Sequence, residues 1–137
     1  MEEVVHARGH EHVSAEHAST FEVTTDDFLT PAGDCILAIE ADRAPADFGE
    51  SFVAACADMA ATIVATIEVE GRTARVEGGG HPDLTFASER SAVARTSTYV
   101  DDRTVMVGAD AAARDIDREI VDALAAGADL CLRLAVE

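Results

Sequence analysis

The sequence contains no lysine and no tryptophan, and it has a single tyrosine. All ten basic residues are arginines, against 27 aspartates and glutamates, which leaves a formal net charge of −17. A dense carboxylate surface stays soluble where concentrated salt screens its self-repulsion. We therefore interpret the composition as that of a halophilic protein rather than an ordinary acidic one. Because this interpretation explains the negative charge as an adaptation to concentrated salt, the charge neither indicates a basic partner nor excludes nucleic acid.

Long apolar runs are also missing, since no stretch approaches the roughly eighteen residues that a membrane-spanning helix needs. The first residues, Met1-Glu2-Glu3-Val4, lack the basic and apolar regions of a secretory signal. A hydrophobic content of 48% excludes a disordered chain. The sequence therefore predicts a soluble, cytoplasmic protein that forms one domain over residues 1–137.

Cysteines are few, odd in number and never spaced as CxxC. A disulfide framework is not expected without a secretory context. Cys56 and Cys131 fall in apolar patterns typical of small core residues. Cys35 follows Gly33-Asp34 at the start of an apolar run. It has two interpretations: a nucleophile activated by a neighbouring His or Arg, or a small buried residue.

What the chain does contain is an internal similarity. The dipeptide Gly9-His10 recurs as Gly80-His81, at an offset of 71 residues. From Asp34 and Asp102 onwards the offset is 68, because the first copy has a three-residue insertion in the preceding turn. The sequence therefore predicts two diverged copies of one unit.

The two copies, residues 1–71 and 72–137, share a β-β-β-α-β pattern. Extended structure is expected at 2–8, 13–24, 35–41 and 62–70, and again at 73–79, 84–95, 103–109 and 130–136. Asp47, followed by Glu50, and later Asp115 have the spacing of helix N-caps. Half-units of about 68 residues are marginal alone. We therefore expect a mainly β (α+β) fold, one sandwich or barrel-like domain with flanking short helices.

Four long segments carry a resemblance to a known family. They read GHEHVSAEHASTFEVT (9–24), DDFLTPAGDCILAIEAD (26–42), GGGHPDLTF (78–86) and TYVDDRTVMVGADAAARDID (98–117). With these motifs the chain resembles the archaeal family of unknown function numbered 371 over nearly its whole length. The resemblance implies an archaeal cytoplasmic protein with a duplicated, sandwich-like fold, and it implies no activity. The family pattern has a second His after each Gly-His, which is His17 in the first copy but Ser88 in the second.

Polar residues that recur in both copies form the candidate catalytic set. They are His10 and His81, Asp34 and Asp102, and then Cys35 and Arg103. All fall at predicted strand ends or turns, where the backbone can aim a side chain. If twofold packing brings these loops together, they share a cleft suited to general acid–base chemistry. Each also has a structural alternative: imidazoles bonded to their turns, aspartates that cap turns, and an arginine paired with Asp101.

A divalent metal is a further hypothesis for the first copy. His10 and His12 share one face of an extended segment, and His17 follows nearby. Position 12 becomes Asp83 in the second copy, so the set is not repeated. The glycines of 78–80 lack the Lys-Ser/Thr and helix of a phosphate loop and instead favour a tight crossing between the units.

Two classes of function stay open at this point, and with them the question of whether the protein is an enzyme. The first is a small-ligand-binding or hydrolytic-type site where the two repeats meet. The second is a non-enzymatic structural or interaction protein in a larger complex. The partner stays open: the sequence is compatible with a small molecule or a protein, no basic aromatic patch indicates base stacking, and no segment indicates a membrane.

Overall fold

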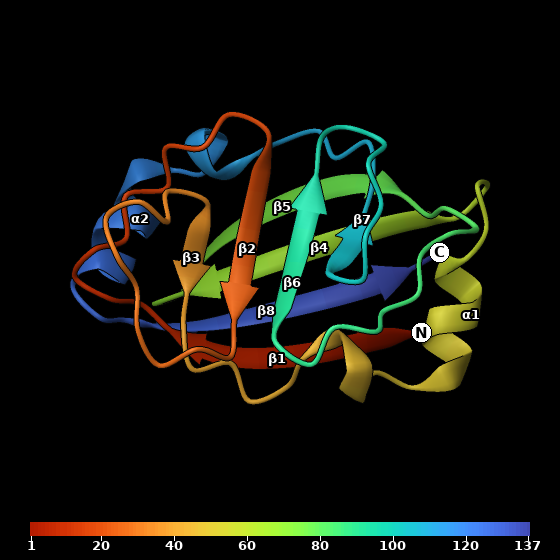
Figure 1. Ribbon diagram of the computed structural model, residues 1–137. Helices are drawn as coiled ribbons and strands as arrows, with labels where there is room; N and C mark the ends of the chain where they lie inside the picture. Colours follow the sequence, from red (N-terminus) through yellow and green to blue (C-terminus); the bar gives the residue numbers. More distant parts are fainter.

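Two four-stranded sheets dominate the computed structural model, which describes all 137 residues (Figure 1). The long sheet has the order β1 (Glu2–Arg8), β8 (Asp129–Val136), β4 (Thr62–Val69) and β5 (Arg72–Gly79), all antiparallel. The short sheet has the order β3 (Ile36–Ala38), β2 (Thr20–Thr24), β6 (Ser91–Arg95) and β7 (Thr104–Met106), antiparallel only between β2 and β6. The predicted mainly β, α+β fold is confirmed.

Two short helices lie at opposite ends of the sheets (Figure 1). They are α1 (Glu50–Cys56) and α2 (Arg118–Ala125), preceded by the 3-10 turns η1 (Pro45–Asp47) and η2 (Ala113–Asp115). In α2, Ile120, Val121 and Leu124 are buried, which gives the helix one apolar side against the core. None of the helices has the length and hydrophobicity that crossing a membrane requires.

The core lies between the two sheets. Alternate side chains of the long strands point inward, so Leu130, Leu132 and Leu134 of β8 are each only 1% exposed. Each buried side chain of this size contributes about 1.5–3 kcal/mol. One cluster of 33 buried residues includes members of every strand. The same cluster therefore anchors both halves of the chain.

The order of elements in the first half recurs in the second. Strands β1, β2 and β3, turn η1, helix α1 and strand β4 are followed by β5, β6, β7, η2, α2 and β8. Unusual backbone recurs too: Ala15 and Phe86 have left-handed φ values of 48° and 51°. We call positions structurally matching where they occupy the same place in this order. Descent of both halves from one duplicated unit stays a prediction.

The strands of the short sheet are shorter than expected. Residues 13–24 were predicted as extended, yet β2 begins only at Thr20, and β6 likewise begins only at Ser91. The preceding residues form loops that are held by side chains and by the left-handed residues described above. Strand β3 ends early because Ile39 leaves the short sheet and exchanges two backbone hydrogen bonds with Arg8 of β1.

Asp47 and Asp115 do not cap the helices, and this part of the prediction is wrong. Each instead closes a 3-10 turn, since its Oδ2 accepts the backbone N–H three residues earlier at 2.9 Å. The helices start later because these turns precede them. Helix α2 is capped by Asp117, whose Oδ1 accepts the N–H of Glu119 at 2.8 Å. Gly49 takes the matching place before α1.

Candidate functional site

The first Gly-His turn packs against the end of α2. The Gly9 N–H donates to the carbonyl of Ala128 at 2.8 Å, and a Cβ on Gly9 would lie 1.9 Å from the carbonyl oxygen of Leu124. Only glycine fits this approach to the helix backbone. The next residue holds its own turn, because His10 Nδ1 accepts the N–H of His12 at 3.0 Å.

The second Gly-His turn makes the same contacts with α1. A Cβ on Gly80 would lie 2.2 Å from the carbonyl oxygen of Cys56, and His81 Nδ1 accepts the N–H of Asp83 at 3.0 Å. The tight crossing expected for the glycine run is found here. Because α1 and α2 lie at opposite ends of the molecule (Figure 1), the structure does not bring His10 and His81 into one cleft.

The hydrogen bonds of these histidines define what their rings can do. His17 follows the same scheme, since its Nδ1 accepts the N–H groups of Ser19 and Thr20, both at 3.2 Å. A neutral imidazole whose Nδ1 accepts carries its proton on Nε2. In this neutral form, the outward edge of each ring is an N–H donor, with no lone pair to bind a metal or to accept a proton.

The predicted metal set is not assembled. The rings of His10 and His12 lie 5.1 Å apart between centroids. However, no group of three His, Cys, Asp or Glu side chains in the molecule has a geometry that could hold a metal ion. The Nδ1 atoms of His10 and His17 are already occupied by their turns. We therefore assign these residues to the turn rather than to a metal site.

Cys35 and Arg103 occupy structurally matching places on the two edges of the short sheet. The Cys35 carbonyl accepts the N–H of Glu22, and the Arg103 carbonyl accepts the N–H of Val93, both at 2.9 Å. Strands β2 and β6 stand between them. Three strand spacings separate such positions by about 14 Å. The two side chains therefore do not meet.

The Cys35 thiol lacks the properties of a nucleophile. Burial, the nearby Glu22 carboxylate and then Asp34 raise its pKa to about 11, although Thr20 opposes the shift. Its Sγ lies 3.6 Å from Glu22 Oε1, an acceptor and not a cation. A reactive cysteine needs the opposite environment, one that favours the thiolate. Cys35 is thus a protonated thiol at neutral pH.

Asp34 and Asp102 contribute their backbone rather than their carboxylates. The Asp34 carbonyl accepts the N–H of His17 at 3.2 Å, and the Asp102 carbonyl accepts the N–H of Ser88 at 3.0 Å. Neither carboxylate makes a hydrogen bond or an ion pair within the protein. The two loops therefore depend on the backbone carbonyls at these positions, which any residue type could supply.

The carboxylate that does organise this region is Asp101, which the repeat comparison passed over. Its Oδ1 accepts the Arg103 N–H and the Thr104 hydroxyl, both at 3.0 Å, and its Oδ2 pairs with Arg95 at 3.0 Å. Burial alone would raise the pKa of Asp101, but these hydrogen bonds lower it below the usual value. Arg103 also pairs with Asp101, at 3.3 Å, as the structural alternative foresaw. The matching position in the first half is Gly33, so recurrence gave no signal.

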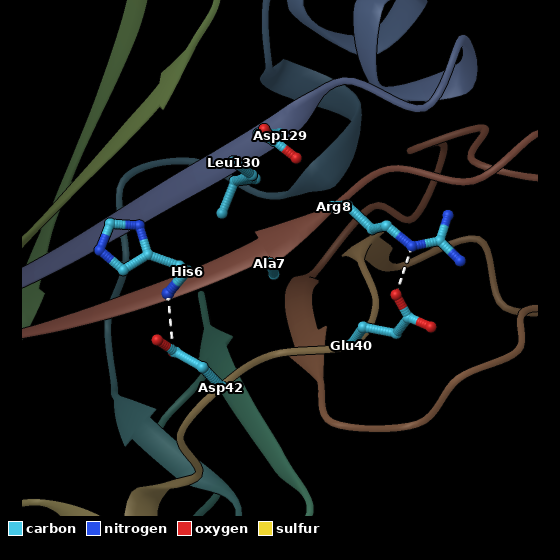
Figure 2. Close-up of a pocket in the computed structure, with 7 residues that line it drawn as sticks. All are labelled: His6, Ala7, Arg8, Glu40, Asp42, Asp129 and Leu130. Carbon is cyan, nitrogen blue, oxygen red and sulfur yellow. Dashed lines mark hydrogen bonds and ion pairs between the residues drawn. The ribbon is translucent and has the colours of Figure 1, made fainter.

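A polar cleft of about 400 Å³ lies where the two halves meet (Figure 2). Its lining comes from β1, from the segment after β3 and from the start of β8: His6, Ala7, Arg8, Glu40, Asp42, Asp129 and Leu130. Figure 2 shows polar side chains of both halves around this cleft. The set shares no residue with the candidate catalytic set.

The cleft is built where β1 pairs with the segment after β3. The His6 N–H donates to Asp42 Oδ1 at 2.9 Å, and the Asp42 N–H donates to the His6 carbonyl at 2.9 Å (Figure 2). Strand alternation places His6 and Arg8 on the outer side of β1, with Ala7 turned to the core. Their spacing is therefore fixed by the strand and by the Asp42 contact.

Glu40 has an unusual backbone for its residue type. Its φ is 54°, in the left-handed region, where the second half has a glycine, Gly108, at 57°. A non-glycine residue there costs about 1–2 kcal/mol. The Arg8 Nε donates to Glu40 Oε2, which raises the pKa of Arg8 and lowers that of Glu40 (Figure 2). Strain retained beside a cleft is a pointer to function.

Comparison with known proteins identifies the family of this chain. The model of the family described as Domain of unknown function (DUF371) matches residues 5–137. The chain belongs to this family. An uncharacterised protein of Methanocaldococcus jannaschii is 42% identical over 136 residues, covering 99% of this chain and all of the relative. The resemblance seen in the sequence is confirmed, and its archaeal character is supported by this relative.

Within this DUF371 chain, the cleft offers acceptors from three carboxylates and donors from two side chains. The His6 ring and the Asp129 carboxylate make no hydrogen bond or ion pair with the protein. Asp42 uses one oxygen on His6, and Arg8 is held by Glu40. The His6 ring, the Asp129 carboxylate and the second oxygen of Asp42 are therefore free to bind a polar molecule.

Sequence reasoning missed this cleft because it selected residues that recur. The cleft residues of the DUF371 chain differ between halves: His6 matches Glu77, Arg8 matches Gly79 and Glu40 matches Gly108. Asp42 recurs as Asp110, and both make the same bond to a strand N–H, at 2.9 and 3.0 Å. The available signal was therefore the opposite one: Arg8 and Glu40 occupy positions at which the other half has glycine.

Proposed function

We propose that this protein binds a small polar ligand in the cleft of Figure 2, at the junction of its two halves. One observation carries the proposal: side chains of both halves converge there with hydrogen-bonding atoms that no protein group uses. The cleft volume of about 400 Å³ lies within the range of small-molecule sites. The strained Glu40 beside it supports the same proposal.

The chemistry of the ligand follows from the balance of groups. Glu40, Asp42 and Asp129 supply acceptors, so the ligand carries several hydroxyl or amine donors. Arg8, oriented by Glu40, takes one acceptor or anionic group of the same ligand. The site therefore suits a donor-rich molecule such as a polyol or an amino compound with one acidic group.

We propose binding rather than hydrolysis. A hydrolytic site needs a nucleophile or a general base that a third group orients. The candidate catalytic histidines hold turns through Nδ1, and Cys35 is protonated. In the cleft, the His6 ring has no orienting partner. Binding is thus the activity that the geometry supports best.

A thermal-shift screen of polar amino compounds and polyols tests the proposal. A ligand at one hundred times its Kd adds about 2.7 kcal/mol to the stability of the folded state. We expect His6→Ala and Asp129→Ala to lose this stabilisation. The matched control is Glu77→Ala, which changes the place of His6 in the other half. Stabilisation that survives both cleft variants would rule the site out.

A second candidate function is an interaction protein in a larger complex. One observation favours it: Phe28 and Tyr99 occupy structurally matching loops and are 56% and 60% exposed. Exposed aromatic side chains are common anchors of protein interfaces. Cross-linking in cell extract followed by mass spectrometry tests this function. Cross-links that map to both loops and that disappear in a Phe28→Ser, Tyr99→Ser variant would support it, and their persistence would exclude it.

We also infer adaptation to concentrated salt, in the cytoplasm of a halophile. The support is the net charge of −17 carried by a chain without lysine. Like charges at this density repel one another unless salt screens them. The melting temperature should rise as KCl is raised from dilute to molar concentration, and a flat response would contradict the inference.

A further inference from the structure

A second cavity, of about 340 Å³, lies beside α1 and shares no residue with the polar cleft. It is bounded by η1, by one side of α1 along its whole length and by the loop that carries the left-handed Phe86. Its lining includes Pro45, Ala46, Phe48, Glu50, Thr85 and Phe86.

The structurally matching place beside α2 holds no cavity, because the Arg118 side chain fills it. Its guanidinium lies within hydrogen-bond distance of five carbonyl oxygens, Ser14 at Nη1 (3.2 Å) and the other four at Nη2, which shares its two hydrogens among them: Ala15 (3.0 Å), Ala113 (3.1 Å), Arg114 (3.4 Å) and Ile116 (3.0 Å). A ring of main-chain acceptors thus surrounds an arginine of the chain itself. It is the densest set of bonds made by any arginine in the molecule.

The backbone around the two places is alike. Each 3-10 turn is closed by its aspartate at 2.9 Å. Each is also tied to the opposite loop, by Ala46 N–H to the Ser88 carbonyl at 2.9 Å and by Arg114 N–H to the His17 carbonyl at 3.1 Å. The five acceptors around Arg118 therefore match Thr85, Phe86, Pro45, Ala46 and Phe48, all of which line the cavity.

In the cavity these acceptors lack the donor that the other half provides. The carbonyls of Thr85, Phe86, Ala46 and Phe48 accept no hydrogen bond within the protein. The position of Arg118 is taken by Glu50, whose carboxylate makes no ion pair. The first half therefore has a carboxylate where the second half has a guanidinium, beside backbone carbonyls at the places that match the carbonyl ring.

We propose that the cavity beside α1 binds a guanidinium group from outside the chain, either on a free small molecule or on an arginine side chain. A guanidinium presents five N–H donors in one plane, which suits a ring of carbonyls better than the compact, strongly hydrated ammonium of lysine. Glu50 supplies the opposite charge at the rim. The Arg43 guanidinium already stacks on the ring of Phe48, with its Cζ 5.3 Å from the ring centroid. We therefore expect Phe48 to contact the ligand through its backbone carbonyl.

The loops before β2 and β6 each contain one left-handed residue, and we expect both residues to direct a carbonyl at a guanidinium. Ala15, at φ 48°, turns its carbonyl to Arg118 at 3.0 Å. Phe86, at φ 51°, occupies the matching place at the cavity. A bulky residue in this conformation is strained by about 1–3 kcal/mol. An acceptor aimed at an external donor gives that strain a function.

Amide NMR titration of the intact protein tests the proposal with two probes. Methylguanidinium represents the free source, and acetyl-Gly-Arg-Gly-amide represents the side chain of a polypeptide. We expect saturable shifts confined to residues 45–50 and 84–88, at least about ten-fold tighter than for methylammonium and the lysine peptide. Binding of methylguanidinium alone assigns a free ligand, and tighter binding of the arginine peptide assigns a side chain. No saturable shift, or equal binding of the lysine probes, would overturn the proposal.

Variants of α1 test whether the cavity itself is the place where methylguanidinium binds. Glu50→Arg restores the arginine of the other half, so it should fill the cavity and weaken methylguanidinium binding at least about ten-fold. Glu50→Gln keeps the cavity open and should retain weaker binding. Ala54→Leu, on the exposed side of α1, occludes the cavity without a new charge and covers the case in which Glu50→Arg does not fold. Undiminished binding by the folded occluding variants would contradict the proposal.

Discussion

His17 and Ser88 hold the same turn in the two halves with different atoms. His17 Nδ1 accepts the backbone N–H groups two and three residues later, both at 3.2 Å. Ser88 Oγ accepts the two N–H groups at the same spacing, both at 3.1 Å. Ser88, which departs from the family pattern, therefore makes the same two hydrogen bonds to the turn as His17 does. The histidine is there as an acceptor, which removes the main reason to place it in a catalytic or metal site.

His17→Ser should accordingly be tolerated, whereas His17→Ala should cost about 1 kcal/mol, because two backbone donors lose their acceptor. Urea denaturation of the three proteins measures the difference. Ser88→Ala is the matched control in the other half and should lose a similar amount. A His17→Ser protein as unstable as His17→Ala would contradict the turn-holding role.

The two Gly-His turns should be intolerant of any side chain on glycine. Gly9→Ala and Gly80→Ala place a Cβ against main-chain carbonyls, which cannot move aside as a side chain can. We expect each to lose more than about 3 kcal/mol, beyond the usual cost of overpacking. Thermal and urea denaturation give the values. Gly49→Ala is the control, since its Cβ would meet only the flexible end of Glu3 at 3.3 Å; equal losses would refute the packing argument.

Acid should weaken the fold through Asp101. Its pKa is lowered in the folded state, so the stability it contributes is present above its unfolded pKa of about 3.9 and is lost as pH falls through the lower folded value. Asp101→Asn should cost about 1–3 kcal/mol at neutral pH and less at about pH 3. Urea denaturation at both pH values measures this. Asp102→Asn, whose carboxylate bonds nothing, should be neutral, and a pH-independent loss at Asp101 would exclude the mechanism.

Arg118→Ala should open a second carbonyl ring and destabilise the protein, because several carbonyls lose their donor at about 1–3 kcal/mol each when buried. Methylguanidinium at a concentration that leaves the unaltered protein folded should raise the melting temperature of Arg118→Ala more than methylammonium does. Glu119→Ala, the next residue on α2, serves as the control. The absence of a selective rise would show that the carbonyl ring has no preference for guanidinium.

The regular part of the fold could be predicted because its signals are local. Alternation of apolar residues over 62–70 and 130–136 marked β4 and β8 to within a residue or two, since both strands have one buried face. The loops before β2 and β6 also contain residues that favour strands. Their structure depends on contacts with turns from the other half, which no local pattern contains.

The candidate site was less predictable for a related reason. Recurrence in both halves selects residues that both halves need, and those turned out to serve the backbone, as at Asp34. The polar cleft and the guanidinium cavity lie where the halves differ, at Glu40 against Gly108 and at Glu50 against Arg118. Only the three-dimensional equivalence of these positions makes the differences informative.

A crystal structure of the protein with the strongest ligand of the thermal-shift screen tests the central proposal most directly. We predict ligand density in the polar cleft, with a donor group of the ligand on Asp129 and an acceptor group on Arg8. Density at either Gly-His turn, with the cleft unchanged, would contradict the account.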